Sequence, residues 1–199
     1  MRVTRQTFAT HRAALLAEAG KLFRGRGIGG VGVSEIAQAA GLTHGAFYGH
    51  FPSKSDLAAE AFTAALTDSA GQWRARAARA RAEGRDPLGA LIEAYLSERH
   101  RDAPETGCAL AALGAEVVRD AAMQGALRAG IAALTAVLEE ELARLHPGLD
   151  PPAIARRALA MLSVMNGGLL TARALASDPD RSRETLRGAA ELARQAAER

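Results

Sequence analysis

The chain has 199 residues, of which 48% are hydrophobic and 24% are charged, the balance of a globular protein in water. No apolar run reaches the roughly 18 residues that a membrane span needs. The polar, basic start of the chain also lacks the apolar stretch of a secretory signal. Cys108 is the single cysteine, so an internal disulfide is excluded, and we expect a protein of the reducing cytoplasm with no membrane partner.

Charge is distributed unevenly along the chain. Residues 1–55 contain seven basic and two acidic side chains, a net charge of +5; the whole chain carries +3, which leaves −2 for residues 56–199. A basic end on a slightly acidic body is typical of a protein whose N-terminal part contacts a polyanion such as nucleic acid. On charge alone, a chance fluctuation of surface composition explains the asymmetry equally well.

Alanine and leucine dominate the composition and aromatic residues make up only 4%, which favours helices throughout. Breaks at Gly, Pro and N-cap residues divide the chain into about nine helices with no convincing strand. We expect the helices at about 10–24, 33–39, 43–50, 53–82, 87–101, 107–118, 121–145, 150–175 and 182–198. The predicted fold class is all-α, with a three-helix N-terminal unit followed by a larger helical body.

Two short predicted helices follow the first long one and meet at a glycine turn. Gly32 occupies the N-cap position of the first, Gly41 the turn, and Thr43 the N-cap position of the second. Phe47 and Phe51 are expected in the core. Two short helices braced by an earlier one form a helix-turn-helix, which places a single helix in the DNA major groove. We place this motif at about residues 32–51.

The stretch from Gly32 to Leu57 resembles the signature of the TetR family of transcriptional regulators. The matching positions are Ile36-Ala37, Ala40-Gly41-Leu42-Thr43, Gly45, Phe47-Tyr48, His50-Phe51, Ser53-Lys54 and Asp56-Leu57, with Leu15-Leu16, Leu22-Phe23 and Gly27 before them. The resemblance covers about residues 10–62; the remaining chain matches only in the number and length of its helices. It implies a DNA-binding domain over 1–62 and an effector-binding and dimerisation domain over 63–199.

The resemblance also implies DNA contacts that the side-chain chemistry supports. Thr43 can bond a phosphate while capping the recognition helix, whose first turn enters the groove in such motifs. Lys54 lies at a helix N-terminus, where free amides attract phosphate. The alternative for each polar residue is a solvated surface position. The predicted DNA-binding residues are Ser34, Thr43, His44, Gly45, Tyr48, His50 and Lys54.

The recognition helix is poor in side chains that read bases. No Arg, Lys, Asn or Gln lies between Thr43 and Phe51, so the usual bidentate readers are absent. We therefore predict that His44 and Tyr48 supply most of the direct readout and that DNA shape supplies much of the rest. The glycine-rich loop over 27–32 lacks a Ser or Thr cap, and we expect it to leave the DNA-binding domain flexible before DNA is bound.

Family likeness implies that the last two long helices pair with those of a second copy as a four-helix bundle. The predicted interface residues are Leu159, Leu162, Met165, Gly167, Leu170, Leu186 and Ala190. Packing within one chain is the alternative. A homodimer is favoured because one short helix reads few bases, and a twofold protein reads the two halves of a palindromic operator in double-stranded DNA.

A small-molecule pocket is expected among the helices that span 54–146. Its candidate lining residues are Phe62, Trp73, Tyr95, Cys108, Leu113 and Met123, although each is also explained as ordinary core. The low aromatic and charge content of these helices predicts an apolar or weakly polar effector. The alternative is a DNA-binding protein of the same fold that has no small-molecule effector and in which side chains fill the space of the pocket.

Cys108 supports a further alternative. The segment Thr106 to Val117 resembles one found in TetR relatives that include electrophile-sensing repressors, in which the cysteine is modified. A thiol in the first turn of a helix has a lowered pKa, whereas a lone cysteine is most often buried and inert. The sequence leaves both readings open.

Other patterns carry no chemistry. Gly25 to Gly30 spells GxGxxG but follows a helix, not a strand, which argues against a dinucleotide site. The five histidines lack metal-ligand spacing, and no nucleophile elbow or acid/base constellation appears. We therefore expect no cofactor, no metal and no enzyme activity. The arginine-rich run over 74–81 is interpreted as a solvated helix end.

Overall fold

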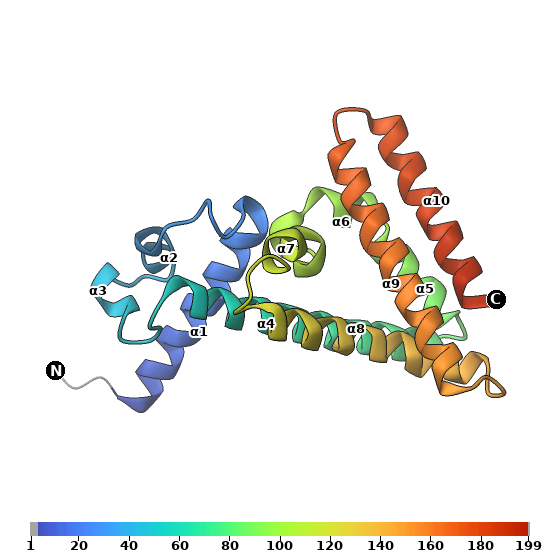
Figure 1. The fold of residues 1–199 in the computed structure, drawn as a ribbon, viewed down its shortest axis with the longest axis horizontal. Coiled ribbons are helices and arrows are strands. Elements are labelled where there is room, and N and C mark those ends of the chain that lie inside the picture. Colours follow the sequence, from blue (N-terminus) through green and yellow to red (C-terminus); the bar gives the residue numbers. More distant parts are fainter. Residues whose placement is uncertain (1–3, 199) are drawn as a thin grey trace.

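The computed structural model describes residues 4–198 and consists of helices joined by short connections (Figure 1). No strand occurs within this range, so the all-α prediction is confirmed. The elements are α1 (Arg5–Arg26), α2 (Val33–Ala39), α3 (His44–Phe47), α4 (Lys54–Ala82), α5 (Pro87–Tyr95), α6 (Glu98–Asp102), the 3₁₀ helix η1 (Pro104–Thr106), α7 (Ala109–Val117), α8 (Gln124–Leu145), α9 (Pro151–Ala174) and α10 (Pro179–Glu198).

Three parts follow one another along the long axis of the molecule. Figure 1 shows α1, α2 and α3 gathered around the beginning of α4 at one end, with α4 and α8 running side by side through the middle. At the other end α9 and α10 form an antiparallel pair against α5. One cluster of buried apolar side chains extends from Leu15 in α1 to Ala197 in α10.

Side-chain caps fix the beginnings of several helices where the sequence predicts them. The hydroxyl of Thr43 accepts the N–H of Ala46 at 3.3 Å, and that of Ser53 accepts the N–H of Asp56 at 3.1 Å. The carboxylate of Asp150 does the same for α9. Such caps each contribute about 1 kcal/mol of helix stability. Gly32 precedes α2 without a side-chain cap, also as predicted, and Gly41 in the turn has φ 72°.

The single helix predicted over 87–101 is wrong, because the chain breaks at Leu96 and Ser97 into α5 and α6. Leu96 leaves the helical region with ψ 52°, and the hydroxyl of Ser97 accepts the N–H of His100 to begin a new helix. No glycine or proline marks this break. It raises the α-helix count from the predicted nine to ten in the described residues.

The α9–α10 pair packs closely within one chain. A Cβ atom at Gly168 would lie 2.3 Å from the Cβ of Ala189, so the approach of the two helices depends on this glycine. The hydroxyl of Ser182, which is fully buried, donates to the carbonyl of Ala172 at 2.7 Å and fixes the connection between the helices. Among the described residues, none of the helices is both long and apolar enough to span a membrane.

Candidate functional site

The outer face of α3 is the first candidate site. Phe47 on its inner side is fully buried and Phe51 is 1% exposed, which confirms that both belong to the core. Thr43, His44 and Gly45 are exposed, and Tyr48 is 54% exposed. The rings of His44 and Tyr48 meet edge to face at 5.4 Å, so they form one continuous polar and aromatic surface.

Ser34 and His50 lie in different surroundings. Ser34 is exposed at the first turn of α2. His50 is half-buried; its ring lies 4.2 Å from that of Phe8, and its Nδ1 atom has no hydrogen-bond partner among residues 4–198. Burial, with smaller contributions from His11 and Arg12, lowers the pKa of His50. This histidine is therefore biased toward its neutral form.

Lys54 points into the protein rather than outward. Its ammonium group donates to the carbonyls of Ile28 at 2.9 Å and Val31 at 3.1 Å. Arg26 donates to the carbonyl of Gly30 at 3.0 Å. These bonds anchor the glycine-rich loop, which the sequence alone presents only as flexible.

Two polar contacts join the N-terminal unit, formed by α1–α3 and the start of α4, to the rest of the chain. The carboxylate of Glu116 in α7 accepts the backbone N–H of Ile28 at 2.9 Å. The guanidinium of Arg24 in α1 donates to the carbonyl of Glu105 in η1 at 2.7 Å. Burial lowers the pKa of Arg24, while Cys108 and Asp68 nearby oppose that shift. Both contacts tie the N-terminal helices to the segment from η1 to α7.

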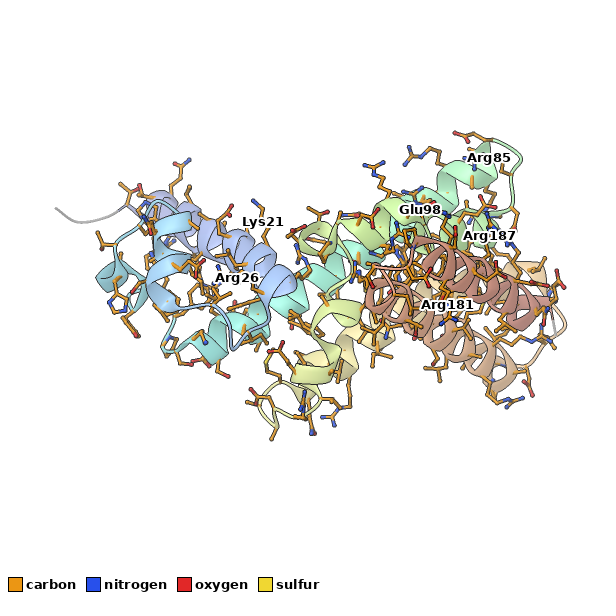
Figure 2. All side chains as sticks on the ribbon, turned by 90° about the horizontal axis from the view of Figure 1, so that it is seen from above. Lys21, Arg26, Arg85, Glu98, Arg181 and Arg187 are labelled. Atoms are coloured by element: carbon orange, nitrogen blue, oxygen red, sulfur yellow. The ribbon has the colours of Figure 1, made fainter. Side chains whose placement is uncertain are left out.

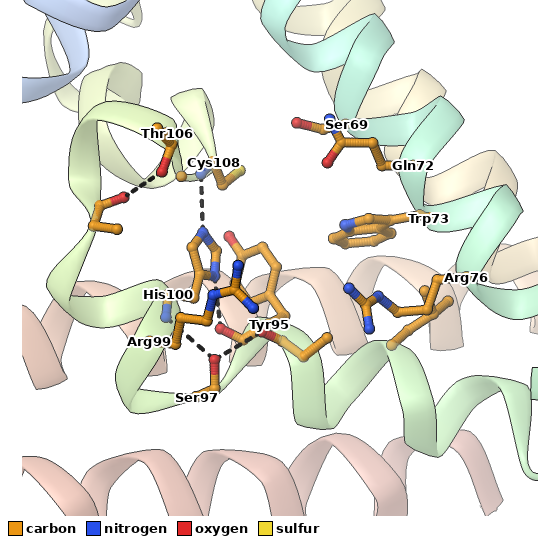
Figure 3. A pocket seen from close by; sticks show the side chains of 14 residues that line it. Ser69, Gln72, Trp73, Arg76, Tyr95, Ser97, Arg99, His100, Thr106 and Cys108 are labelled. Carbon is orange, nitrogen blue, oxygen red and sulfur yellow. Dashed lines mark hydrogen bonds between the residues drawn. The ribbon is translucent and has the colours of Figure 1, made fainter.

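A pocket of about 370 Å³ opens between α4 and the segment from α5 to the start of α7. Figure 3 shows Trp73 and Arg76 on α4 facing Tyr95, His100 and Cys108 across it. Its lining residues are Ser69, Gln72, Trp73, Arg76, Leu91, Ala94, Tyr95, Ser97, Arg99, His100, Ala103, Thr106, Gly107 and Cys108.

Only half of the predicted lining residues reach this pocket. Trp73, Tyr95 and Cys108 form part of its wall. Phe62, Leu113 and Met123 lie in the core, at most 3% exposed, and do not line it. The polar lining residues, including Gln72, Arg76 and Arg99, were missed because an apolar effector was expected.

His100 connects two segments of the pocket wall through hydrogen bonds. Its Nδ1 pairs with the carbonyl of Tyr95 at 2.7 Å, so Nδ1 carries the proton, and Nε2 accepts the N–H of Cys108 at 3.0 Å. Burial is the main cause that lowers the pKa of His100; Arg173 acts in the same direction and the bond to Tyr95 opposes it. The neutral ring therefore joins the end of α5 to the N-cap residue of α7.

The predicted interface residues divide between two faces of the α9–α10 pair. Leu162, Met165 and Leu186 are at most 4% exposed, because they pack inside the chain. Leu159 and Leu170 are 49% and 51% exposed on the outer side of α9. Gly167 and Ala190 are half-buried, and a Cβ at Gly167 would meet no other part of residues 4–198 within 4 Å beyond its own helix backbone. Leu192 on α10 is also exposed, at 55%, and is not among the predicted residues.

Charged side chains follow the whole length of the molecule. Figure 2 shows Lys21 and Arg26 on the N-terminal unit, far from Arg85 and Arg187 at the opposite end. Among the residues that the structure describes, no three His, Cys, Asp or Glu side chains gather as metal ligands would.

Comparison with known proteins gives a family for the N-terminal unit. Residues 15–61 match the family described as bacterial regulatory proteins of the tetR family. A stretch of 59 residues is 44% identical to the HTH-type transcriptional regulator AcrR of Shigella flexneri. That match spans 30% of this chain and 27% of the length of the relative.

Solved structures extend the likeness of fold to nearly the whole chain. The reduced form of NemR from E. coli has a TM-score of 0.73 at 23% identity, covering 91% of this chain and 94% of the other. A TetR family regulator from Cytophaga hutchinsonii has a TM-score of 0.74 at 18% identity and 98% coverage of both chains. The helix-turn-helix unit therefore belongs by sequence to the tetR family of bacterial regulatory proteins, and the chain as a whole shares its fold with TetR family structures.

Proposed function

We propose that the protein is a homodimeric repressor that binds a palindromic operator and is released from it by a small ligand. The single observation that carries the DNA-binding part is the outer face of α3, where Thr43, His44, Gly45 and Tyr48 are exposed over a fully buried Phe47. A helix that presents its first turn in this way suits the major groove. In this proposal residues 1–62 contact DNA, and residues 63–199 bind the ligand and the second copy.

The proposed contacts divide by position. His44 and Tyr48 reach base edges, while the Thr43 hydroxyl, the backbone at Gly45 and the Ser34 hydroxyl contact phosphates. His50 and Lys54, predicted as phosphate contacts, act indirectly in this proposal. His50 supports the start of the DNA-binding unit through its packing on Phe8, and Lys54 shapes the loop before α2.

A second copy of the chain is the proposed occupant of the outer α9–α10 face. Leu159, Leu170 and Leu192 are each about half exposed there, and three large exposed leucines on neighbouring helices favour burial in an interface. The open space over Gly167 permits close approach of a partner helix. The fold shared with TetR family structures supports the same arrangement.

Ligand release is proposed to act through η1. The pocket wall includes Thr106 and Cys108, which flank Gly107 at the end of η1. The neighbouring Glu105 carbonyl accepts a bond from Arg24 of α1. A ligand that shifts this wall changes a contact with the DNA-binding unit directly.

The test is a DNA-binding measurement at a fixed salt concentration, because salt controls how much the phosphate contacts contribute to the affinity. Operator candidates selected from a random duplex library should yield a twofold-symmetric sequence, bound by two copies per site. Selection of a sequence without symmetry, or no enrichment at all, would contradict the proposal.

Cys108 carries a second candidate function, an electrophile sensor. Its side chain is 4% exposed, yet it forms part of the pocket wall, so a small reagent entering the pocket meets the thiol. A Cys108→Ser variant should then keep DNA binding but lose release by a thiol-alkylating reagent such as N-ethylmaleimide. Release that persists in this variant would remove the sensor.

A further inference from the structure

We propose that the pocket between α4 and α5–α7 is built for a small organic carboxylate, not for the apolar ligand that the composition predicts. The inference rests on the proposed function only in taking this pocket as the effector site. It is carried by four features of the pocket: its unpaired arginines, the positive charge behind its floor, a buried hydroxyl that lacks an acceptor, and an aromatic wall.

Two arginines line the pocket with no acidic residue among the lining side chains. Arg76 comes from α4 and Arg99 from α6, and Figure 3 shows the Arg76 side chain extending from its helix toward Tyr95. Neither guanidinium forms an ion pair or hydrogen bond with any residue in 4–198, whereas Arg74 and Arg81 of the same helix pair with Glu140 and Glu141. A guanidinium without a partner beside a cavity favours a carboxylate, which it can bind through two parallel hydrogen bonds.

A third cation lies behind the pocket floor. Arg173 of α9 donates to the carbonyls of His100 at 2.9 Å and Arg101 at 3.2 Å, and its charge acts on both Tyr95 and Cys108. Its hydrogen bonds are to carbonyl groups, and among residues 4–198 no carboxylate forms an ion pair with it, although the charge of Glu105 acts on it from a greater distance. The field in the pocket therefore favours an anion.

The Tyr95 hydroxyl is a buried donor that no oxygen or nitrogen acceptor satisfies among residues 4–198. The residue is 3% exposed, and its hydroxyl faces the thiol of Cys108, a weak acceptor that forms no hydrogen bond of ordinary geometry with it. Burial, followed by the effect of Cys108, raises the pKa of Tyr95 well above its ordinary value, so the group remains O–H. An unsatisfied buried donor is costly, and a carboxylate oxygen at this wall would satisfy it.

The remaining wall sets the shape of the ligand body. The rings of Trp73 and Tyr95 meet edge to face with their centroids 5.5 Å apart, and Leu91 is a further apolar lining residue. The pocket volume of about 370 Å³ is near the lower end of the range for ligand sites. These features suit a compact apolar or aromatic body that carries one carboxylate.

Trp73 makes the proposal directly measurable, because it is the only tryptophan in the chain and it lines the pocket. The probes are phenylbutanoate, its neutral amide phenylbutanamide, and inorganic phosphate, each titrated against the full-length protein while Trp73 fluorescence is recorded. The carboxylate should bind about tenfold or more tightly than the amide, since one charge-assisted contact is worth about that factor. Phosphate, which lacks the apolar body, should bind more weakly than the carboxylate.

Variants locate the source of the preference. Arg76→Met and Arg99→Met should each reduce the preference for carboxylate over amide by about tenfold. Tyr95→Phe should weaken carboxylate binding and leave the thermal midpoint unchanged or higher, because it removes an unpaired hydroxyl. Arg79→Met is the matched control on α4: it also lacks an ion pair within residues 4–198 but does not line the pocket, and it should leave binding unchanged.

The outcomes separate this inference from the proposed function. Equal binding of carboxylate and amide, an unchanged preference in both arginine variants, or no response to a series from hexanoate to dodecanoate would overturn the carboxylate assignment. Carboxylate binding that fails to release operator DNA would instead contradict the proposed ligand release and leave the assignment standing. Release by neutral apolar compounds alone would support the proposed function and overturn the assignment.

Discussion

The carboxylate of Glu116 accepts the backbone N–H of Ile28 at 2.9 Å, and this bond joins α7 to the loop between α1 and α2. Glu116 is half-buried, and the acceptor lies 88 positions away from the donor in sequence. The loop is also held from α4 by Lys54. The loop between α1 and α2 is thus held from two sides, by Lys54 at the start of α4 and by Glu116 of α7.

Removing this acceptor should destabilise the junction. Glu116→Ala leaves the part-buried Ile28 N–H without a partner, and the free energy of unfolding should fall by about 1–2 kcal/mol. Glu116→Gln keeps a side-chain oxygen in reach and should retain most of that stability. Chemical denaturation measures the difference, and amide hydrogen exchange at Ile28 locates it. An alanine variant with unchanged stability and unchanged exchange would show that the bond contributes nothing.

Gly27, at the start of the same loop, should tolerate no side chain. Its φ of 77° lies in the left-handed region, and a Cβ would come within 2.7 Å of the Glu116 carboxylate. Gly27→Ala should cost about 1–2 kcal/mol from the backbone alone. Gly29→Ala is the control, since nothing lies within 4 Å of a Cβ there. Equal thermal midpoints for the two variants would contradict this account.

The two exposed aromatic side chains of α3 should carry sequence discrimination. His44→Ala and Tyr48→Ala should each reduce the ratio of operator to scrambled-DNA affinity by about tenfold, because one good base contact is worth about 1–3 kcal/mol. Thr43→Ala should instead weaken binding to both DNAs, through loss of the helix cap and a phosphate contact. Fluorescence anisotropy at one salt concentration provides the comparison. An unchanged ratio in both aromatic variants would assign specificity to DNA shape alone.

The outer leucines of α9 should control assembly. Leu159→Glu or Leu170→Glu places a charge in the proposed interface and should convert dimer to monomer in sedimentation velocity. Leu145→Glu is the matched control: this residue is 54% exposed, like the others, but lies at the end of α8. The same loss of dimer in the control, or its persistence in both α9 variants, would place the interface elsewhere.

Acid should loosen the wall of the pocket through His100. Its folded-state pKa is lowered, mainly by burial, so the unfolded chain binds the proton first. The contribution of neutral His100 to the free energy of unfolding is complete above the unfolded-state pKa of about 6.5. This contribution is lost as the pH falls from there toward the lowered folded-state pKa. Below the folded-state pKa the free energy of unfolding no longer changes through His100. His100→Gln should therefore flatten the dependence of stability on pH below about 6.5.

His50 titrates in the same direction, so it must be separated from this effect. A His50→Gln variant gives its share of the slope, and hydrogen exchange at the Cys108 amide reports His100 alone, because protonated Nε2 can no longer accept from that N–H. If His100→Gln leaves the slope as steep as in the parent protein, the proposed titration is wrong.

The sequence predicts the DNA-binding unit well because its signals are local. The N-cap positions at Thr43 and Ser53 are each determined by residues within a few positions along the chain. The break at Ser97 lacks such a signal: the Ser97 cap competes with continuation of α5, and no glycine or proline lies between Ala90 and Asp102 to mark the end of that helix. Local pattern alone gives no reason to prefer the break.

The pocket and the interface depend on which side of each helix faces the core, and composition does not determine that. Leu159 and Leu162 lie three positions apart on α9, yet one is 49% exposed and the other 4% exposed. The sequence groups them into one apolar stripe. Lys54 shows the same limit: a lysine at a helix N-terminus resembles a phosphate ligand until the carbonyls of Ile28 and Val31 are brought beside it by the fold.

The continuity of α4 has a consequence for exchanging parts between such proteins. One unbroken helix, Lys54–Ala82, supplies both the lysine that anchors the loop before α2 and the tryptophan and arginine of the pocket wall. A graft made at residue 62 divides this helix between the lysine that anchors the loop and the residues that line the pocket. It also separates Ile28 from its own Glu116. A transplanted N-terminal unit will therefore keep this junction bond only if the recipient's α7 carries an acceptor at the position of Glu116.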